Sequence, residues 1–168
     1  DLKIIGALPN LQHLTLSGCG LSTAAGLETA TSITHLDLSQ NTIRDLTPVK
    51  SMSGLQELIL HHNAVNDLTA LSGMTSLKNL DVSYNLLGSI NPIFNCSTIT
   101  SLNVANNTLT SLTGIEKLSS LEMLNVSNNT LSELTPIAEC INIKMLDISE
   151  NMLTDISPIS AMNQLQTL

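Results

Sequence analysis

Histidines and carboxylates are the residues of this sequence with the clearest chemical potential. All four histidines lie in the first half of the chain, and three carboxylates are expected near them on the same face; the set is His13, His35, Asp37, Glu57, His61, His62 and Asp81. Imidazole and carboxylate groups together bind transition metals. The same pair also serves as the base and the orienting acid of nucleophilic catalysis, so Asp37 with His35 or His61 could be drawn as part of a triad.

Both chemistries need side chains that converge in an enclosed site with supporting groups around it. The sequence has no glycine-rich phosphate loop, no G-x-S-x-G element and no H-E-x-x-H pair. The histidines also fall at positions that the repeat described below places on an open face. We therefore expect no enzyme activity, no cofactor and no metal site. A polar patch that contacts a protein is the favoured role of these residues, and a metal site is the weaker alternative.

Composition and charge exclude other classes of function. The chain has 168 residues, with 14 acidic and six basic side chains and a net charge of −8, which disfavours nucleic acid and anionic membrane surfaces. It has one Phe, one Tyr and no Trp, so a core must be built from aliphatic residues. No apolar run is long enough to span a membrane, and no signal peptide is present. We expect no membrane insertion.

A 22-residue period positions all of these side chains. Leucine or isoleucine recurs without insertion or deletion at Leu11, Ile33, Leu55, Leu77, Ile99, Leu121, Ile143 and Leu165. Inside each period a segment such as His35–Ser39 alternates apolar and polar residues, which predicts a short strand with one buried face. Successive periods then stack their strands into one parallel sheet.

Two further positions of the period predict structure. An asparagine column at 41, 63, 85, 107, 129 and 151, with Cys19 in the first period, is expected to satisfy buried backbone groups at the turn after each strand. The Thr47-Pro48, Asn91-Pro92, Thr135-Pro136 and Ser157-Pro158 pairs predict a helix N-cap and first residue, followed by a short 3₁₀ or α segment. Val49 and Met52, or Ile137 and Cys140, would then face the core.

These residues carry a family resemblance. The frame L-x-x-L-x-L-x-x-N-x-L covers the whole chain, which is identified as a member of the leucine-rich repeat family of the 22-residue type. Asp45–Val49 and Asp155–Ile159 resemble the arm of bacterial internalins, whereas Leu112–Glu116 is similar to the eukaryotic type of phosphatase regulators and axonemal adaptors. The resemblance implies an α/β solenoid, a horseshoe with a concave parallel β-sheet and short 3₁₀ or α segments on the convex side.

The repeat also defines the domain organisation. We expect a single array over residues 1–168, with a partial repeat at 1–10, repeats starting at 11, 33, 55, 77, 99, 121 and 143, and a partial repeat at 165–168. The chain starts and stops within a period, so we interpret it as a fragment of a longer protein. The three cysteines are too far apart in the repeat for a disulfide and are expected to be small buried residues.

Outward strand positions supply the candidate binding residues. Ile59, Tyr84, Met123 and Met145 are apolar or aromatic where the fold requires only polar groups, which is typical of interface anchors. The candidate protein-binding face comprises His13, His35, Asp37, Glu57, Ile59, His61, His62, Asp81, Tyr84, Asn103, Met123, Asn125, Met145 and Asp147.

The resemblance implies a function for this face. It favours a non-enzymatic protein–protein interaction module that binds a protein ligand on its concave sheet, in an internalin-like surface or secreted protein. Two alternatives remain open: an intracellular eukaryotic scaffold or regulatory subunit, and a purely structural spacer. The identity of the ligand is not encoded in the repeat.

Overall fold

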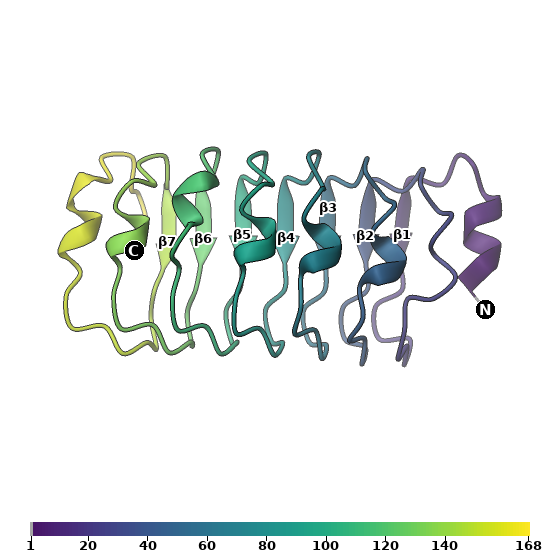
Figure 1. The fold of residues 1–168 in the computed structure, drawn as a ribbon, viewed down its shortest axis with the longest axis horizontal. Helices are drawn as coiled ribbons and strands as arrows, with labels where there is room; N and C mark the ends of the chain where they lie inside the picture. Colours follow the sequence, from purple (N-terminus) through teal and green to yellow (C-terminus); the bar gives the residue numbers. More distant parts are fainter. Residues whose placement is uncertain (1) are drawn as a thin grey trace.

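The computed structural model describes residues 2–168, which form one continuous coil (Figure 1). Seven short strands make a single parallel sheet in chain order: β1 (His13–Thr15), β2 (His35–Asp37), β3 (Glu57–Ile59), β4 (Asn79–Asp81), β5 (Ser101–Asn103), β6 (Met123–Asn125) and β7 (Met145–Asp147). Each strand pairs with the next in a register of 22 residues, as in Leu36 with Leu58. The predicted parallel sheet of a leucine-rich repeat solenoid is therefore confirmed.

The opposite side of the coil carries short 3₁₀ segments, as predicted. They are η1 (Leu2–Ala7), η2 (Thr47–Val49), η3 (Thr69–Leu71), η4 (Asn91–Ile93), η5 (Ile115–Lys117), η6 (Thr135–Ile137) and η7 (Ser157–Ala161). In Figure 1 these segments lie in front of the strands along the length of the molecule. No described helix is long and apolar enough to cross a membrane.

The predicted N-caps are wrong by one residue. Thr47 is the first residue of η2, and Leu46 occupies the N-cap position without a side-chain hydrogen bond. The carboxylate of Asp45 satisfies the segment instead, because its Oδ1 accepts a hydrogen bond from the Thr47 backbone N–H at 2.8 Å. Asp67 and Asp155 do the same for Thr69 and Ser157. The threonine or serine thus belongs to the 3₁₀ turn, and the acid two residues earlier caps it.

Aliphatic side chains between the sheet and the 3₁₀ segments form the core. Leu36, Leu38, Val49 and Met52 are all buried, and the equivalent residues of the next four coils repeat the layer, whereas Ile148 and Ile159 of the coil after them are only partly buried. Phe94 is the one aromatic residue among the buried side chains. It packs where Gly114 has no side chain, since a Cβ there would lie 2.6 Å from the Phe94 ring. This glycine has φ +102°, and η5 begins directly after it.

The first coil departs from the others. Ala24, Leu27 and Ala30 are buried there, but no 3₁₀ segment forms between β1 and β2. Gly26 adopts φ +104°, and a Cβ at this position would lie 2.8 Å from the Lys3 backbone nitrogen of η1. The close approach of η1 therefore requires glycine at residue 26.

The cysteine prediction is corrected in one position. All three thiols are free, and Cys96 and Cys140 are buried, but Cys19 is exposed. Burial raises the pKa of the Cys96 thiol, and burial together with the nearby Glu116 and Glu139 carboxylates raises the pKa of Cys140 to about 11. Cys19 stands in the asparagine column, yet its thiol makes only one long contact, at 3.6 Å to the Ser17 carbonyl oxygen.

Candidate functional site

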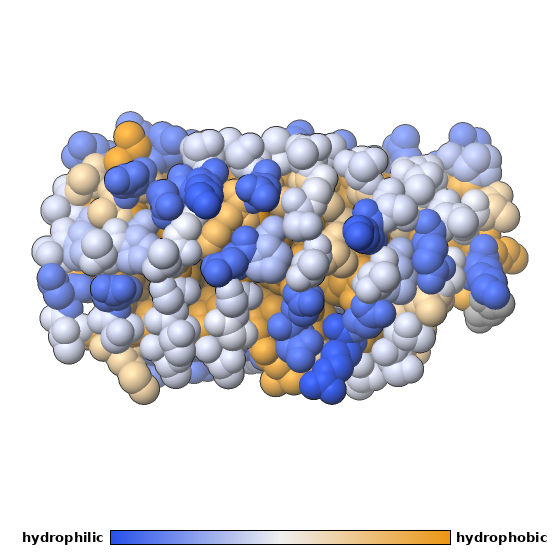
Figure 2. Space-filling model, in the orientation of Figure 1, coloured by the Kyte–Doolittle hydropathy of each residue, from blue (hydrophilic) through white to orange (hydrophobic). Residues whose placement is uncertain are grey.

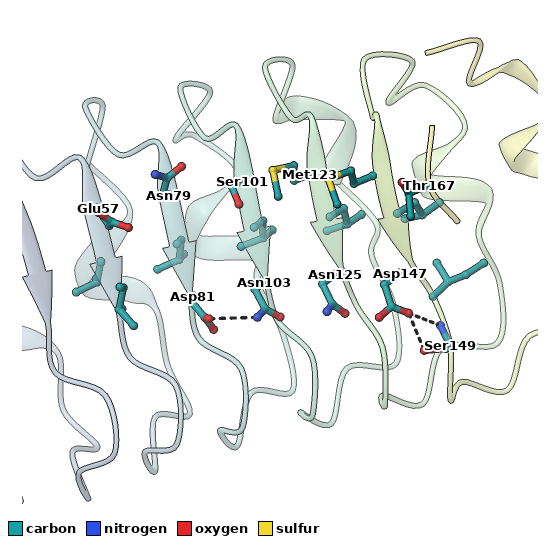
Figure 3. Close-up of a pocket in the computed structure, with 18 of the residues that line it drawn as sticks. Glu57, Asn79, Asp81, Ser101, Asn103, Met123, Asn125, Asp147, Ser149 and Thr167 are labelled. Carbon is teal, nitrogen blue, oxygen red and sulfur yellow. Dashed lines mark hydrogen bonds between the residues drawn. The ribbon is translucent and has the colours of Figure 1, made fainter. Parts of the chain in front are cut away.

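The outward side chains of β1–β7, called the strand face below, contain a hollow over β3–β7. This strand-face groove has a volume of about 1180 Å³ and extends from Glu57 to Thr167 and Leu168. The middle residues of the strands, such as Leu80, Leu102 and Leu124, also line it, although their side chains are buried in the core. Figure 3 shows the groove as two rows of side chains that run across the strands.

The first residue of each strand supplies the upper row. It consists of Glu57, Asn79, Ser101, Met123 and Met145, and it continues to Thr167, which pairs with Met145 in an isolated parallel bridge. Met123 and Met145 are direct partners in the register of β6 and β7, and 43% and 44% of their surfaces are exposed. Two flexible apolar side chains therefore lie side by side and open to solvent in the groove.

The third residue of each strand supplies the lower row, which comprises Ile59, Asp81, Asn103, Asn125 and Asp147. One oxygen of each polar member is used for local structure. Asp147 Oδ1 accepts hydrogen bonds from the backbone N–H and the hydroxyl of Ser149, at 3.0 and 2.6 Å. Asn125 Oδ1 accepts the equivalent pair from Ser127. This turn orients the side chain and leaves its second polar atom outside the turn.

Both aspartates of the lower row accept hydrogen bonds from their neighbours. The Ser149 hydroxyl lowers the pKa of Asp147 more than partial burial of the carboxyl raises it. Asp81 Oδ1 accepts from the Ser83 N–H and hydroxyl, and Asp81 Oδ2 accepts from Asn103 Nδ2 at 3.2 Å. The row thus presents fixed negative charge and amide groups to the groove.

The structure divides the predicted binding residues between two regions. The groove brings together Glu57, Ile59, Asp81, Asn103, Met123, Asn125, Met145 and Asp147. It does not include His13, His35, Asp37, His61, His62 or Tyr84. Sequence reasoning did not select Asn79, Ser101, Ser149, Thr167 and Leu168, which also line it. Asn79 and Ser101 could have been selected from the sequence, because they occupy the same repeat position as Glu57 and Met123.

The histidines form two pairs beside the groove, one stacked and one with its rings nearly perpendicular. The His13 and His35 rings are parallel with centroids 4.2 Å apart, and His35 Nε2 lies 4.0 Å from Glu57 Oε2. His61 and His62 share a hydrogen bond of 3.0 Å between their Nδ1 atoms. Among residues 2–168 there is no group of three or more His, Cys, Asp or Glu side chains arranged to hold a metal ion.

Tyr84 belongs to the edge of the strand face. It has φ +52°, and its ring stacks on His62 at a centroid distance of 4.1 Å. The same left-handed conformation recurs at Gln40, His62, Asn106, Asn128 and Glu150. These residues follow the strands by three positions, where the chain turns away from the sheet. Tyr84 is 49% exposed but lies outside the groove.

The side of the molecule opposite the sheet offers a smaller hollow. It has a volume of about 400 Å³ beside η2 and η3 and is lined by Arg44, Asp45, Lys50, Asp67 and Thr69, among others. Asp45 and Asp67 are already engaged with the turns they cap. Figure 2 shows this side, where apolar surface appears in separate areas among hydrophilic residues. The strand-face groove is the larger candidate site.

Comparisons with known proteins agree on the repeat. A family model described as leucine-rich repeats in two copies matches residues 9–51, 53–95 and 97–139. A comparison with proteins of curated function finds no match.

Solved structures of similar shape include two internalins of Listeria monocytogenes. Internalin C2 is 27% identical with a TM-score of 0.94, over 98% of this chain and 73% of its own. Internalin F is 26% identical with a TM-score of 0.76, over 99% of this chain and 58% of its own. The chain thus spans little more than half the length of internalin F.

Two more distant structures share the fold. A leucine-rich repeat protein of Leptospira interrogans is 21% identical, with a TM-score of 0.93 over 99% of this chain and 44% of its own. The plant peptide hormone receptor RGFR1, solved in complex with RGF2, is 21% identical, with a TM-score of 0.81 over 99% of this chain and 29% of its own.

Proposed function

Because the chain belongs to the leucine-rich repeat family, we propose that it is a non-enzymatic module that binds a protein ligand in the strand-face groove. Proteins of this family generally act in protein–protein interaction. The observation that carries the proposal is the exposed Met123 and Met145 pair, which lies in a groove between two polar rows. Apolar anchors inside a polar rim are the usual composition of a protein interface.

The hydrogen bonding of the sheet indicates that a ligand would be recognised by side chains and not by backbone groups. The strands of the groove hydrogen-bond to one another on both edges, as in Val104 N–H to the Asn125 carbonyl and Ser101 N–H to the Lys78 carbonyl. A ligand over β4–β6 therefore meets side chains rather than free backbone groups. Methionine suits this role because its unbranched thioether adapts to different partner surfaces.

The similarity to two internalins supports a surface or secreted setting. The plant receptor, which was solved with a peptide hormone, supports a ligand-binding use of the same fold. Several ionisable side chains of the strand face take part in ring stacking, in turn hydrogen bonds or in the His35–Glu57 contact, and they do not converge on one point, which supports a binding role over catalysis. The intracellular scaffold and the structural spacer remain the competing hypotheses.

Selection from a random peptide library tests the proposal. Peptides enriched on the immobilised chain should lose roughly 10-fold or more in affinity for the Met123→Ala, Met145→Ala double variant, since each truncation removes an apolar anchor. The matched control is Met152→Ala, which alters an exposed methionine (65% exposed) outside the groove. Affinities are measured by fluorescence anisotropy with labelled peptides.

Two outcomes contradict the proposal. Either no peptide is enriched above background, or the enriched peptides bind the double variant and the wild-type chain equally well. A circular dichroism melt of each variant shows whether the fold is retained, because both methionines are half exposed and neither is a core residue.

A further inference from the structure

The strand-face groove carries charge of only one sign. Three carboxylates line it, those of Glu57, Asp81 and Asp147, and none of its described lining residues is Lys, Arg or His. Basic residues lie beside the groove: Lys144 directly precedes β7 and is paired with Glu122 at 2.8 Å, and Lys78 directly precedes β4. His35 Nε2 lies 4.0 Å from Glu57 Oε2. The whole chain adds to this field with a net charge of −8. The electrostatic complement of the groove is therefore a cationic ligand.

The lower row sets where cations would bind. Asp147 uses Oδ1 for the Ser149 turn, and its Oδ2 takes no part in that turn. Asp81 Oδ2 accepts only one hydrogen bond, from Asn103, and a carboxylate oxygen can accept a second. Each aspartate thus keeps an acceptor for an ammonium or guanidinium group of a ligand.

The spacing of the two aspartates limits the shape of such a ligand. β4 and β7 are three strand steps apart, which is roughly 14 Å at the usual spacing of paired strands. An extended peptide advances about 3.3 Å per residue, so side chains four residues apart are separated by about 13 Å on the same face. The Met123 and Met145 pair lies in the other row of the groove, towards the Asp147 end, because Met145 begins the strand that ends in Asp147.

We propose that the groove binds an extended basic segment of a protein partner. Two Lys or Arg side chains about four residues apart would contact Asp81 and Asp147, and an apolar side chain between or beside them would pack on Met123 and Met145. This inference rests on the proposed function and adds the chemical class of the ligand. Glu57 supplies a third negative contact at the β3 end of the groove.

The chain itself provides a substitution that removes the charge and keeps the fold. Asparagine occupies the same column at Asn103 and Asn125, where its Oδ1 accepts the same turn hydrogen bond from residues 105 and 127. Asp81→Asn with Asp147→Asn therefore keeps the turn hydrogen bonds to residues 83 and 149 and removes two negative charges; at residue 81 it also removes the acceptor of the Asn103 Nδ2 bond. The matched control is Glu133→Gln with Glu139→Gln, which changes the net charge equally at exposed positions outside the groove.

The test uses synthetic peptides with the sequences enriched in the library selection. We expect these sequences to contain Lys or Arg pairs about four residues apart. Their affinity should fall roughly 3- to 10-fold for the Asp81→Asn, Asp147→Asn variant and change little for the control, as two partly exposed ion pairs are lost. Wild-type affinity should also weaken as sodium chloride rises from about 0.05 to about 0.5 M.

The possible results distinguish the basic ligand from the protein-binding role of the groove, on which the basic ligand depends. Peptides that need Met123 and Met145 but are neutral or acidic, and that bind the aspartate variant unchanged, overturn the basic ligand and leave the binding groove standing. If no selected peptide depends on the methionines, both proposals fall. If sedimentation instead shows a dimer that the methionine variant dissociates, the groove binds a second copy of the chain, and the basic partner is rejected.

Discussion

At the residue scale, the asparagine column shows how one side chain type stabilises every turn. Asn85 Oδ1 accepts the Val65 N–H at 2.8 Å, and its Nδ2 donates to the carbonyls of Leu60, Val82 and Ser83 at 3.0 to 3.1 Å. Asn41, Asn63, Asn107, Asn129 and Asn151 repeat these four contacts. An amide is required because the site needs a donor and an acceptor together.

Replacement of Asn85 by alanine should therefore be costly. Asn85 is only 7% exposed, so the Val65 N–H and its carbonyl partners would lose their hydrogen bonds where water has little access. We expect the free energy of unfolding to fall by about 1–3 kcal/mol. Guanidinium unfolding measures this change. Asn66→Ala, at an exposed asparagine without side-chain hydrogen bonds, should leave stability nearly unchanged; equal effects of the two variants would refute the assignment.

At the element scale, carboxylates before the 3₁₀ segments control how each coil turns back. Asp45, Asp67 and Asp155 each accept the N–H of the residue two positions later. The Thr47 and Thr69 hydroxyls, followed by the backbone N–H groups, lower the pKa of Asp45 and Asp67 below the ordinary value of 3.8, and the Ser157 N–H and hydroxyl lower that of Asp155. Because η2, η3 and η7 have only three to five residues, such local bonds contribute more to their geometry than helix propensity does.

The lowered pKa values predict the direction of the acid response. A carboxyl whose folded-state pKa is depressed stabilises the fold above its unfolded pKa, and this contribution is lost as the pH falls through the folded-state value. We therefore expect a melting temperature that is steady from neutral pH to about 5 and declines below about 4.

The three aspartates can be tested by a single variant. The Asp45→Asn, Asp67→Asn, Asp155→Asn chain keeps the acceptor oxygens and removes the titrating groups. Circular dichroism melts between pH 7 and pH 2 should show a shallower acid decline for this variant than for the wild-type chain. An unchanged slope would mean that other carboxyls account for the acid response.

At the scale of the whole molecule, each coil contacts only its neighbours. Each strand pairs with the next strand, and 3₁₀ segments such as η2, η3 and η4 pack on their neighbours, so stability is set by layers stacked along one direction. Central layers are dry, as Leu102 is 1% exposed, whereas Leu14 in β1 is only partly buried. Leucines at the same repeat position are therefore fully buried in the central coils and partly exposed in the first coil.

This difference predicts unequal costs for the same substitution. Leu102→Ala should lower the free energy of unfolding by about 2–5 kcal/mol, because it leaves a cavity between complete layers. Leu14→Ala should cost less, since part of its side chain already contacts water. Equilibrium unfolding in guanidinium compares the two variants under one condition. Equal losses would show that the β1 layer is as tightly packed as the centre.

The candidate site was only partly predictable from the sequence. The period identified both rows, so Glu57, Asp81, Met123 and Asp147 were assigned to the correct face. It could not show that the hollow begins at β3, because this depends on how neighbouring side chains fill the space above the sheet. The His13 and His35 rings stack on each other, and His62 stacks on Tyr84, outside the hollow. Ring stacking is a contact between coils that no single repeat encodes.

The sequence by itself determined the strands, the register and the role of the asparagines, because a strict 22-residue period leaves one way to bury its leucines and pair its backbone. The tertiary structure alone decided three things. Carboxylates, not threonines, cap the 3₁₀ turns, and Cys19 is exposed. One group of outward residues lines a groove with negative charge. The caps and the exposure of Cys19 depend on the backbone conformation adopted within a coil. The groove depends on how side chains of several coils fill the space above the sheet, which the order of residues does not fix.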